Sequence, residues 1–189
     1  MPDRKRAILL TGRPGVGKTT VIRRLVELLG NRPLAGFYTA EIREAGQRVG
    51  FGAMTFSGKT GLLAHTALRS NYRVGRYRVD VAAFEKLVLP ELARPCALLL
   101  IDEIGKMECF SARFVEAVRK VFERRQPLVA TVAASGTGLI AEVRQRTDVE
   151  LWTVTRENRE KLPRQLAAWF ERLGPAGEGE LRHDDRNVS

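Results

Sequence analysis

One stretch restricts the fold of this chain more than any other, the sequence Gly-x-x-x-x-Gly-Lys-Thr at positions 12–19. This spacing is the Walker A pattern of phosphate-binding loops. The preceding residues 7–10 are all apolar, which favours a buried strand, and apolar side chains recur at helical spacing over residues 21–29. Because a phosphate-binding loop lies between a strand and a helix, these flanks support the motif where spacing alone would be weak.

The residue types of this loop suit a polyphosphate ligand. Gly12, Gly15 and Gly17 lack a Cβ atom, so the backbone can wrap closely around a phosphate and adopt positive φ angles. Successive N–H groups and the positive end of the following helix then attract the anion. Lys18 is predicted to reach the β- and γ-phosphates, and the Thr19 hydroxyl is predicted to bind Mg²⁺. The alternative is an ordinary glycine-rich turn between a strand and a helix.

A second motif follows another apolar segment. Residues 97–101 predict a buried strand, and Asp102 and Glu103 come directly after it, which is the Walker B pattern. Asp102 is expected in the Mg²⁺ shell opposite Thr19, while Glu103 could orient and deprotonate a water that attacks the γ-phosphorus. The alternative is that one acid only caps the next segment. A nucleotide kinase transfers the phosphoryl group to a bound acceptor and not to water. The second acid, Glu103, therefore favours hydrolysis over a kinase reaction.

Composition and charge restrict the class of protein further. The chain has 189 residues with 44% hydrophobic and 29% charged content, typical of a globular protein, and no apolar run is long enough to cross a bilayer. The basic N-terminus lacks a signal-peptide core, and Cys96 and Cys109 form no metal-binding spacing. We therefore expect a cytoplasmic protein. The net charge of +10 permits a nucleic-acid partner, but we favour a basic surface that attracts triphosphates.

The order of predicted elements indicates an α/β fold. Apolar strands are expected at residues 7–10, 97–101, 127–133 and 150–155, and helices at 21–29, 80–92, 111–122, 138–146 and 163–173. Alternating strands and helices of this kind favour a mostly parallel sheet covered by helices. Residues 36–66 lack a helical period and predict an antiparallel hairpin insertion, and residues 71–79 predict an extended loop. We expect one domain over residues 1–173 and a disordered tail over 174–189.

Several segments together resemble the THEP1-type nucleoside-triphosphatases, relatives of the cancer-related nucleoside-triphosphatase. They are residues 12–20, 36–43, 48–51, 74–80, 98–108, 154–155 and 158–159. The run Asp-Glu-Ile-Gly-Lys-Met-Glu at 102–108 is the most specific of them. The resemblance implies a RecA-like P-loop fold and Mg²⁺-dependent hydrolysis of ATP, GTP, CTP and UTP, with broad base tolerance.

The resemblance also implies two nucleotide-binding segments. The first contains Gly12, Arg13, Pro14, Gly15, Val16, Gly17, Lys18 and Thr19. The second contains Leu98, Leu99, Leu100, Ile101, Asp102, Glu103, Ile104 and Gly105. Within them, Lys18 and Glu103 are the expected catalytic residues, and Thr19 and Asp102 the expected metal ligands.

Other residues leave alternatives open. Lys106 and Glu108 could act on phosphate charge or belong to a solvated loop. Arg159 could contact a nucleotide, and the arginines at 73, 76 and 78 could supply charge to a transition state, although surface charge is the interpretation we favour. A nucleoside or nucleotide kinase and a nucleic-acid-stimulated ATPase remain the alternative functions. The preferred base and the oligomeric state do not follow from the sequence.

Overall fold

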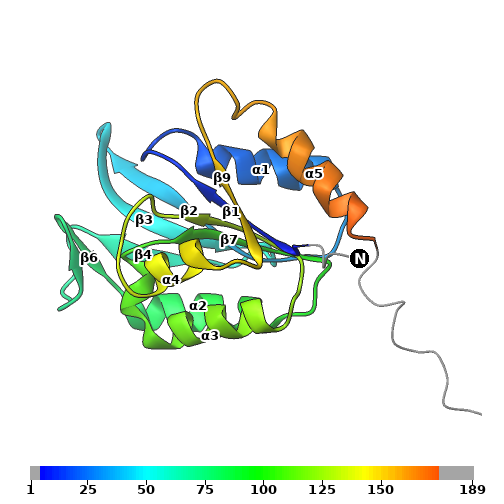
Figure 1. Ribbon diagram of the computed structural model, residues 1–189. Helices are drawn as coiled ribbons and strands as arrows, with labels where there is room; N and C mark the ends of the chain where they lie inside the picture. Colours follow the sequence, from blue (N-terminus) through cyan, green and yellow to red (C-terminus); the bar gives the residue numbers. More distant parts are fainter. Residues whose placement is uncertain (1–4, 175–189) are drawn as a thin grey trace, which may run out of the picture.

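The computed structural model describes residues 5–174, whose strands join into one nine-stranded sheet (Figure 1). The strands in chain order are β1 (Ala7–Thr11), β2 (Leu34–Glu44), β3 (Gln47–Thr55), β4 (Thr60–His65), β5 (Arg73–Val74), β6 (Tyr77–Val79), β7 (Leu98–Ile104), β8 (Leu128–Val132) and β9 (Val149–Thr153). Within these residues, no helix combines the length and apolar character that crossing a membrane requires. The tail expected at 174–189 lies outside the described residues apart from Gly174.

Helices cover both faces of this sheet. They are α1 (Lys18–Leu29), α2 (Val81–Ala93), α3 (Ala112–Glu123), α4 (Leu139–Gln145) and α5 (Leu162–Arg172), with a short 3₁₀ helix η1 (Glu108–Phe110). Two of the predicted helix starts carry side-chain caps, because Asp80 Oδ1 accepts from the Ala83 N–H and Ser111 Oγ accepts from the Phe114 N–H.

The sheet has a parallel half and an antiparallel half. Its strand order is β5-β6-β4-β3-β2-β7-β8-β1-β9, and the pairs from β2 through β7, β8 and β1 to β9 are parallel. β2 belongs to both halves, since its first residues pair with β7 and residues 37–44 pair with β3 in the antiparallel sense. The α/β class with a mostly parallel core and an antiparallel addition is therefore confirmed. We call β3–β6 and the second half of β2 the strand extension.

The helices lie on the two faces of the sheet (Figure 1), and an apolar core lies between the sheet and the helices on each face. One lies between the sheet and the helices α2, α3 and α4, while the other lies between the sheet and the pair α1 and α5. Successive residues of β1 alternate between them, with Leu9 in the first core and Ile8 in the second. Strands that are buried on both faces read as continuous apolar runs, which explains why β1, β7 and β8 were recognisable from the sequence.

The expectation of a loop at residues 71–79 was wrong in part. β5 and β6 form a hairpin, with Val74 opposite Tyr77, and β6 also pairs with β4. Gly75 has a φ of 58° in the connection between these strands. Strands of two and three residues are too short to show an alternating pattern, so the sequence alone did not indicate this hairpin.

Phe37 on β2 makes the largest testable contribution to the first core. It is fully buried, and its ring packs edge-on against Phe84 at 5.5 Å and Phe114 at 6.0 Å between centroids. Phe37→Ala is expected to lower the free energy of unfolding by about 3–5 kcal/mol in denaturant titrations, because it leaves a cavity between sheet and helices. The control Leu28→Ala alters a side chain that is 51% exposed and should cost less than about 1 kcal/mol. Equal losses in the two variants would contradict this assignment of the core.

Candidate active site

The phosphate loop connects β1 to α1 as the sequence predicted. Lys18 is the first residue of α1. Its side chain is 9% exposed, and its Nζ lies 3.4 Å from the Gly12 carbonyl oxygen. Gly12 has a φ of 155°, and a Cβ at this position would come within 2.7 Å of the Val154 carbonyl oxygen. Gly17, at the N-terminus of α1, has a φ of 111°. These glycines allow the loop to adopt a conformation that residues with a Cβ would strain.

The two motifs meet at the carboxyl ends of β1 and β7, which lie on either side of β8 in the sheet. The Thr19 hydroxyl donates to Asp102 Oδ2 at 2.6 Å, and Lys18 Nζ lies 3.9 Å from Glu103 Oε2. Because β7, β8 and β1 are parallel neighbours, their carboxyl ends share one edge of the sheet, where ligands of such folds bind. The structure thus brings together the four side chains that the sequence singled out for chemistry.

Asp102 is held by a residue that the sequence analysis missed. The hydroxyl of the fully buried Thr131, on β8, donates to Asp102 Oδ1 at 2.5 Å. Burial raises the pKa of Asp102, which is 1% exposed, while hydrogen bonds from Thr131 and Thr19 and the Lys18 charge oppose that rise. A hydroxyl residue within an otherwise apolar strand was the available signal, but threonine is also common in strands without such a role.

Glu103 lies beside Asp102 but is more accessible. Its side chain is 31% exposed, and a cis peptide bond joins the two acids. Burial raises the pKa of Glu103, whereas the neighbouring Lys18 ammonium lowers it. The carboxylate therefore reaches the cleft while remaining close to a cation.

The apolar part of the second motif contributes to the core instead of the cleft. The side chains that are fully buried there belong to Leu98, Leu99, Leu100, Ile101 and Ile104. With no exposed surface, these side chains hold Asp102 and Glu103 in position. The nucleotide contact that the resemblance implied for residues 98–105 stays a prediction, and Glu103 is the member of the segment that lines the cleft.

Glu108 occupies an unusual environment behind Glu103. It is 5% exposed, and its Oε2 would lie 2.8 Å from a Cβ placed on Gly105, so the glycine makes room for the carboxyl group. Burial raises the pKa of Glu108 to about 8, and the negative charges of Glu103 and Asp102 add to the rise against backbone hydrogen bonds. Lys106 is exposed, so these two residues differ strongly in environment although they lie in one short loop.

Two hollows open on either side of the phosphate loop. The first, which we call the phosphate cleft, has a volume of about 890 Å³ and contains Lys18, Thr19 and Glu103 among its walls. The second, which we call the loop cavity, has a volume of about 700 Å³ and lies between the phosphate loop and residues 153–157 after β9. Gly12, Pro14, Gly15 and Ala134 line both hollows, so the two lie next to each other.

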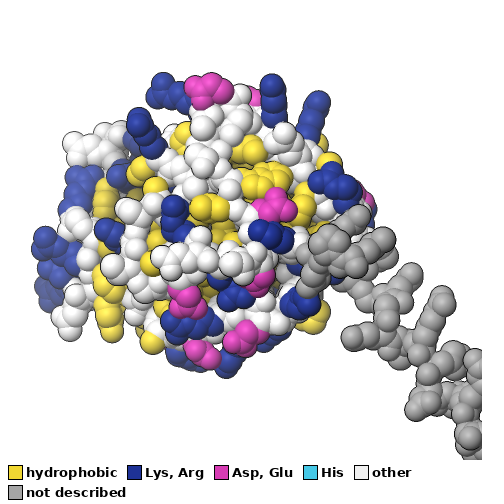
Figure 2. All heavy atoms as spheres, in the orientation of Figure 1, with side chains coloured by type: hydrophobic (Ala, Val, Ile, Leu, Met, Phe, Trp, Pro, Cys, Tyr) yellow, Lys and Arg dark blue, Asp and Glu magenta, His cyan; other side chains and the backbone are white. Residues whose placement is uncertain are grey.

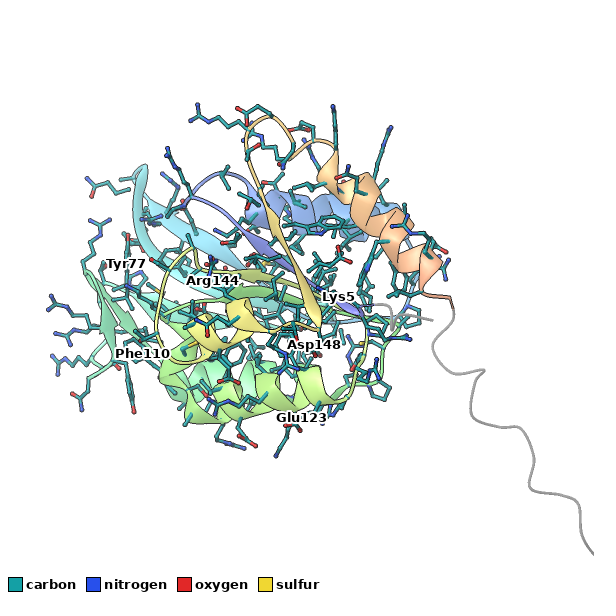
Figure 3. All side chains as sticks on the ribbon, in the orientation of Figure 1. Lys5, Tyr77, Phe110, Glu123, Arg144 and Asp148 are labelled. Atoms are coloured by element: carbon teal, nitrogen blue, oxygen red, sulfur yellow. The ribbon has the colours of Figure 1, made fainter. Side chains whose placement is uncertain are left out.

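Two arginines brace the phosphate loop from neighbouring elements. Arg144 on α4, labelled in Figure 3, donates to the Thr11 hydroxyl at 2.8 Å and to the Ala133 carbonyl at 3.3 Å, and it lines the loop cavity. Arg159 donates to the Val16 carbonyl at 3.2 Å. Arg144 was not singled out from the sequence, and Arg159 was considered only as a possible ligand contact. No spacing rule connects an arginine to a strand end 133 residues away.

The side chain of the neighbouring residue Asn158 is hydrogen-bonded to the backbone. Its Oδ1 accepts from the Thr155 N–H at 2.8 Å, and its Nδ2 donates to the Thr153 carbonyl at 2.8 Å. These bonds fix the turn that follows β9, which forms part of the wall of the loop cavity. Both polar groups of the Asn158 side chain therefore hold this turn.

The fold and the joined Walker motifs define an α/β protein of the P-loop class. Residues 7–167 match the protein family described as NTPase, and the chain belongs to that family. It is 43% identical over 162 residues to the nucleoside-triphosphatase THEP1 of Thermotoga sp. strain RQ2, covering 84% of this chain and 92% of that protein. It is 41% identical over 175 residues to the human cancer-related nucleoside-triphosphatase, covering 83% and 92% respectively.

A solved structure agrees with this membership. The crystal structure of THEP1 from the hyperthermophile Aquifex aeolicus matches with a TM-score of 0.80 and 36% sequence identity. The match covers 87% of this chain and 99% of that chain. The family resemblance drawn from the Asp-Glu-Ile-Gly-Lys-Met-Glu run and the Walker motifs is thereby confirmed.

The buried Glu108 carboxyl generates a prediction about stability and pH. Its pKa is raised from 4.5 to about 8, so between these pH values the folded state binds its proton more tightly than the unfolded state. The stabilisation is fully present below about pH 4.5 and is lost as pH rises through about 8. Glu108→Gln should remove this loss, so its melting temperature relative to wild type should increase as the pH is raised from 5 to 9.

The control for this measurement is Glu116→Gln, which alters an exposed carboxylate on α3. Its melting temperature should follow the wild-type pH profile. If the Glu108→Gln and wild-type profiles run parallel across the whole range, the carboxyl group is not protonated in the folded protein.

Proposed function

We propose that this protein hydrolyses nucleoside triphosphates to the diphosphate and inorganic phosphate in an Mg²⁺-dependent reaction. The observation that carries the proposal is the meeting of the two motifs in one cleft, where Thr19 bonds to Asp102 and Lys18 lies 3.9 Å from Glu103. The relatives named as nucleoside-triphosphatases support the same reaction. Because both halves of the site arise from one continuous sheet, we treat residues 1–173 as a single domain.

The roles of the side chains follow from their charges and positions. Lys18 and the loop N–H groups bind the β- and γ-phosphates, which places the γ-phosphorus near Glu103. Glu103 accepts a proton from a water whose oxygen forms the new bond to the γ-phosphorus. The bond from that phosphorus to the β-phosphate oxygen then breaks, and the diphosphate leaves with the electron pair. The ammonium of Lys18 offsets negative charge that develops on the phosphate oxygens.

The residues at the end of β7 suit Mg²⁺. Thr19 Oγ1 and Asp102 Oδ2 are oxygen ligands 2.6 Å apart, and oxygen is the ligand that Mg²⁺ prefers. Within residues 5–174, no group of three or more His, Cys, Asp and Glu side chains is placed to bind a metal alone. Thr19 and Asp102 would therefore hold the ion together with phosphate oxygens and water, and the bound ion would supply positive charge for the phosphates.

The nucleoside end of the substrate is assigned to the loop cavity. This cavity adjoins the phosphate loop, and its walls include Val154, Arg156 and Glu157. Glycine, proline, alanine, valine and threonine line this cavity together with charged side chains, so it offers shape and general polarity more than a fixed pattern of hydrogen bonds that would select one base. We therefore propose broad base tolerance.

The kinase alternative would use the same phosphate loop but needs a pocket for a phosphate acceptor, and the nucleic-acid-stimulated alternative needs a surface that binds a polyanion.

The direct test measures phosphate release from ATP, GTP, CTP and UTP with and without Mg²⁺. Release is expected with each nucleotide, and the four kcat/KM values should agree within about one order of magnitude. In EDTA the release should fall to background. Adding nucleosides or monophosphates should yield no phosphorylated product, and adding RNA at low salt should not accelerate release. A phosphorylated acceptor in place of free phosphate would identify a kinase and overturn the proposal.

Glu103→Gln separates chemistry from binding. The amide has nearly the same shape but cannot accept the proton, so kcat should fall at least about 100-fold, while nucleotide affinity should stay within about threefold. Lys18→Ala is the companion variant and should lose both affinity and rate. Unchanged phosphate release by Glu103→Gln would remove Glu103 from the mechanism. Unchanged affinity in Lys18→Ala would refute the assignment of the phosphate loop.

A further inference from the structure

The strand extension forms one wall of the phosphate cleft. Residues from β2, β3 and β6 face this hollow together with Lys18 and Glu103, namely Tyr38, Glu41, Arg48, Phe51 and Tyr77. The catalytic half of the sheet and the extension therefore enclose the same space. Lys and Arg side chains also gather at the β6 end of the molecule in Figure 2. Of these basic residues the extension places only Arg48 in the cleft wall, beside the Glu41 carboxylate, which raises the question of which anionic group Arg48 contacts.

Arg48 on β3 is the most firmly held cation of this wall. Its Nε donates to the Tyr77 hydroxyl at 2.9 Å, and its Nη1 donates to Glu41 Oε1 at 2.7 Å. Its guanidinium also lies over the rings of Phe51 and Tyr77, at 5.2 and 5.6 Å from their centroids. Tyr77 is labelled in Figure 3. Nη2 has no hydrogen-bond partner among the described residues, so a fixed guanidinium retains donor capacity in the cleft wall.

The cluster around Arg48 carries more positive than negative charge. Arg43 and Arg48 share the single carboxylate of Glu41, and Arg76 donates to the Arg48 carbonyl and stacks on Tyr77. The hydrogen bond from Arg48 lowers the pKa of Tyr77, which is consistent with this excess. Like charges held close together repel one another and are relieved by an anion. The cleft that this cluster faces is the one assigned to a polyphosphate.

The other arginines of the extension are placed differently. Arg78 donates to the Ser70 carbonyl at 2.6 Å, and neither Arg78 nor Arg73 lines the phosphate cleft. Arg76 also does not line it. Arg23 on α1 does line the cleft, but it is exposed and comes from the side of the phosphate loop. Arg48 is thus the arginine that the extension contributes to the cleft opposite that loop.

We propose that Arg48 binds the terminal phosphate of the nucleoside triphosphate and thereby distinguishes triphosphate from diphosphate. This inference rests on the proposed function, since it uses the same cleft and the same ligand. The loop and Lys18 bind the β- and γ-phosphates from one side of the cleft, and the γ-phosphate, as the end of the chain, also presents oxygens to the wall that carries Arg48. Tyr77 and Glu41 act as positioning residues, because they hold the guanidinium without touching the ligand. A diphosphate cannot reach this contact, so it binds without the help of Arg48.

The test compares the affinities of a non-hydrolysable triphosphate analogue and of the diphosphate by calorimetry in the presence of Mg²⁺. Arg48→Ala should weaken analogue binding roughly 10- to 100-fold, the range for a hydrogen bond to a charged group, and should change diphosphate binding less than about twofold. The rate of phosphate release at saturation should also fall. The affinity of Arg48→Lys for the triphosphate analogue should lie between those of the wild type and Arg48→Ala, because lysine keeps the charge but not the planar donor geometry.

Arg43→Ala is the matched control, since it removes a guanidinium from the same Glu41 but not from the cleft wall. It should leave the preference for triphosphate unchanged. Tyr77→Phe removes the hydroxyl that accepts from Arg48 Nε, and it should reduce that preference in part. Thermal denaturation of each variant checks that the strand extension is still folded.

The outcomes are distinguishable from failure of the proposed function. Equal weakening of both ligands by Arg48→Ala, or no weakening of either, would overturn the role of Arg48 whether or not the wild type releases phosphate. A selective loss for the triphosphate analogue would support it even if the protein proved to be a kinase. The same selective loss in Arg23→Ala, with none in Arg48→Ala, would assign the contact to α1 and refute the proposal.

Discussion

The site depends on one buried carboxylate that is held between two hydroxyl groups. Asp102 is 1% exposed, and it accepts hydrogen bonds from Thr19 at the start of α1 and from Thr131 on β8. A buried charge is costly unless it is paired or hydrogen-bonded, so removing either donor would destabilise the ionised form. These bonds connect the carboxyl ends of β7 and β8 to the phosphate loop. The parallel order β7-β8-β1 is what places the three groups at one edge of the sheet.

The strand extension adds a second wall to the phosphate cleft, and it belongs to the same sheet as the phosphate loop's strand. β2 pairs with β7 through its first half and with β3 through its second half, so the catalytic and antiparallel parts form one continuous surface. Gly36 lies where β2 approaches β7 most closely, and a Cβ there would clash with the Leu100 carbonyl. This close approach joins the two halves without a flexible linker. The position of the extension wall relative to Glu103 is therefore set by backbone pairing.

The sequence predicted the parallel core and the four central chemical groups well, because each carries a local signal. The glycine spacing before Lys18 and the acids after an apolar run are readable within a few residues. Thr131 and Arg144 were missed because their roles arise from contacts distant in the chain. The β5–β6 hairpin was missed because its strands are too short to show an alternating pattern. A threonine in a strand and an arginine in a short helix have many uses, and only the folded structure shows that these two residues contact Asp102 and Thr11.

The same reasoning changes the meaning of the net charge of +10. Arg144 donates to the Thr11 hydroxyl and Arg159 donates to the Val16 carbonyl beside the phosphate loop, and Arg48 is fixed by Glu41 and Tyr77. Part of the basic composition is therefore built into the walls around a polyphosphate site. Cations fixed in this way lose little conformational freedom when an anion arrives, so they contribute more to its binding than mobile surface lysines would. These arginines account for part of the surplus of positive charge, and the proposed polyphosphate site gives that part a role without a nucleic-acid partner.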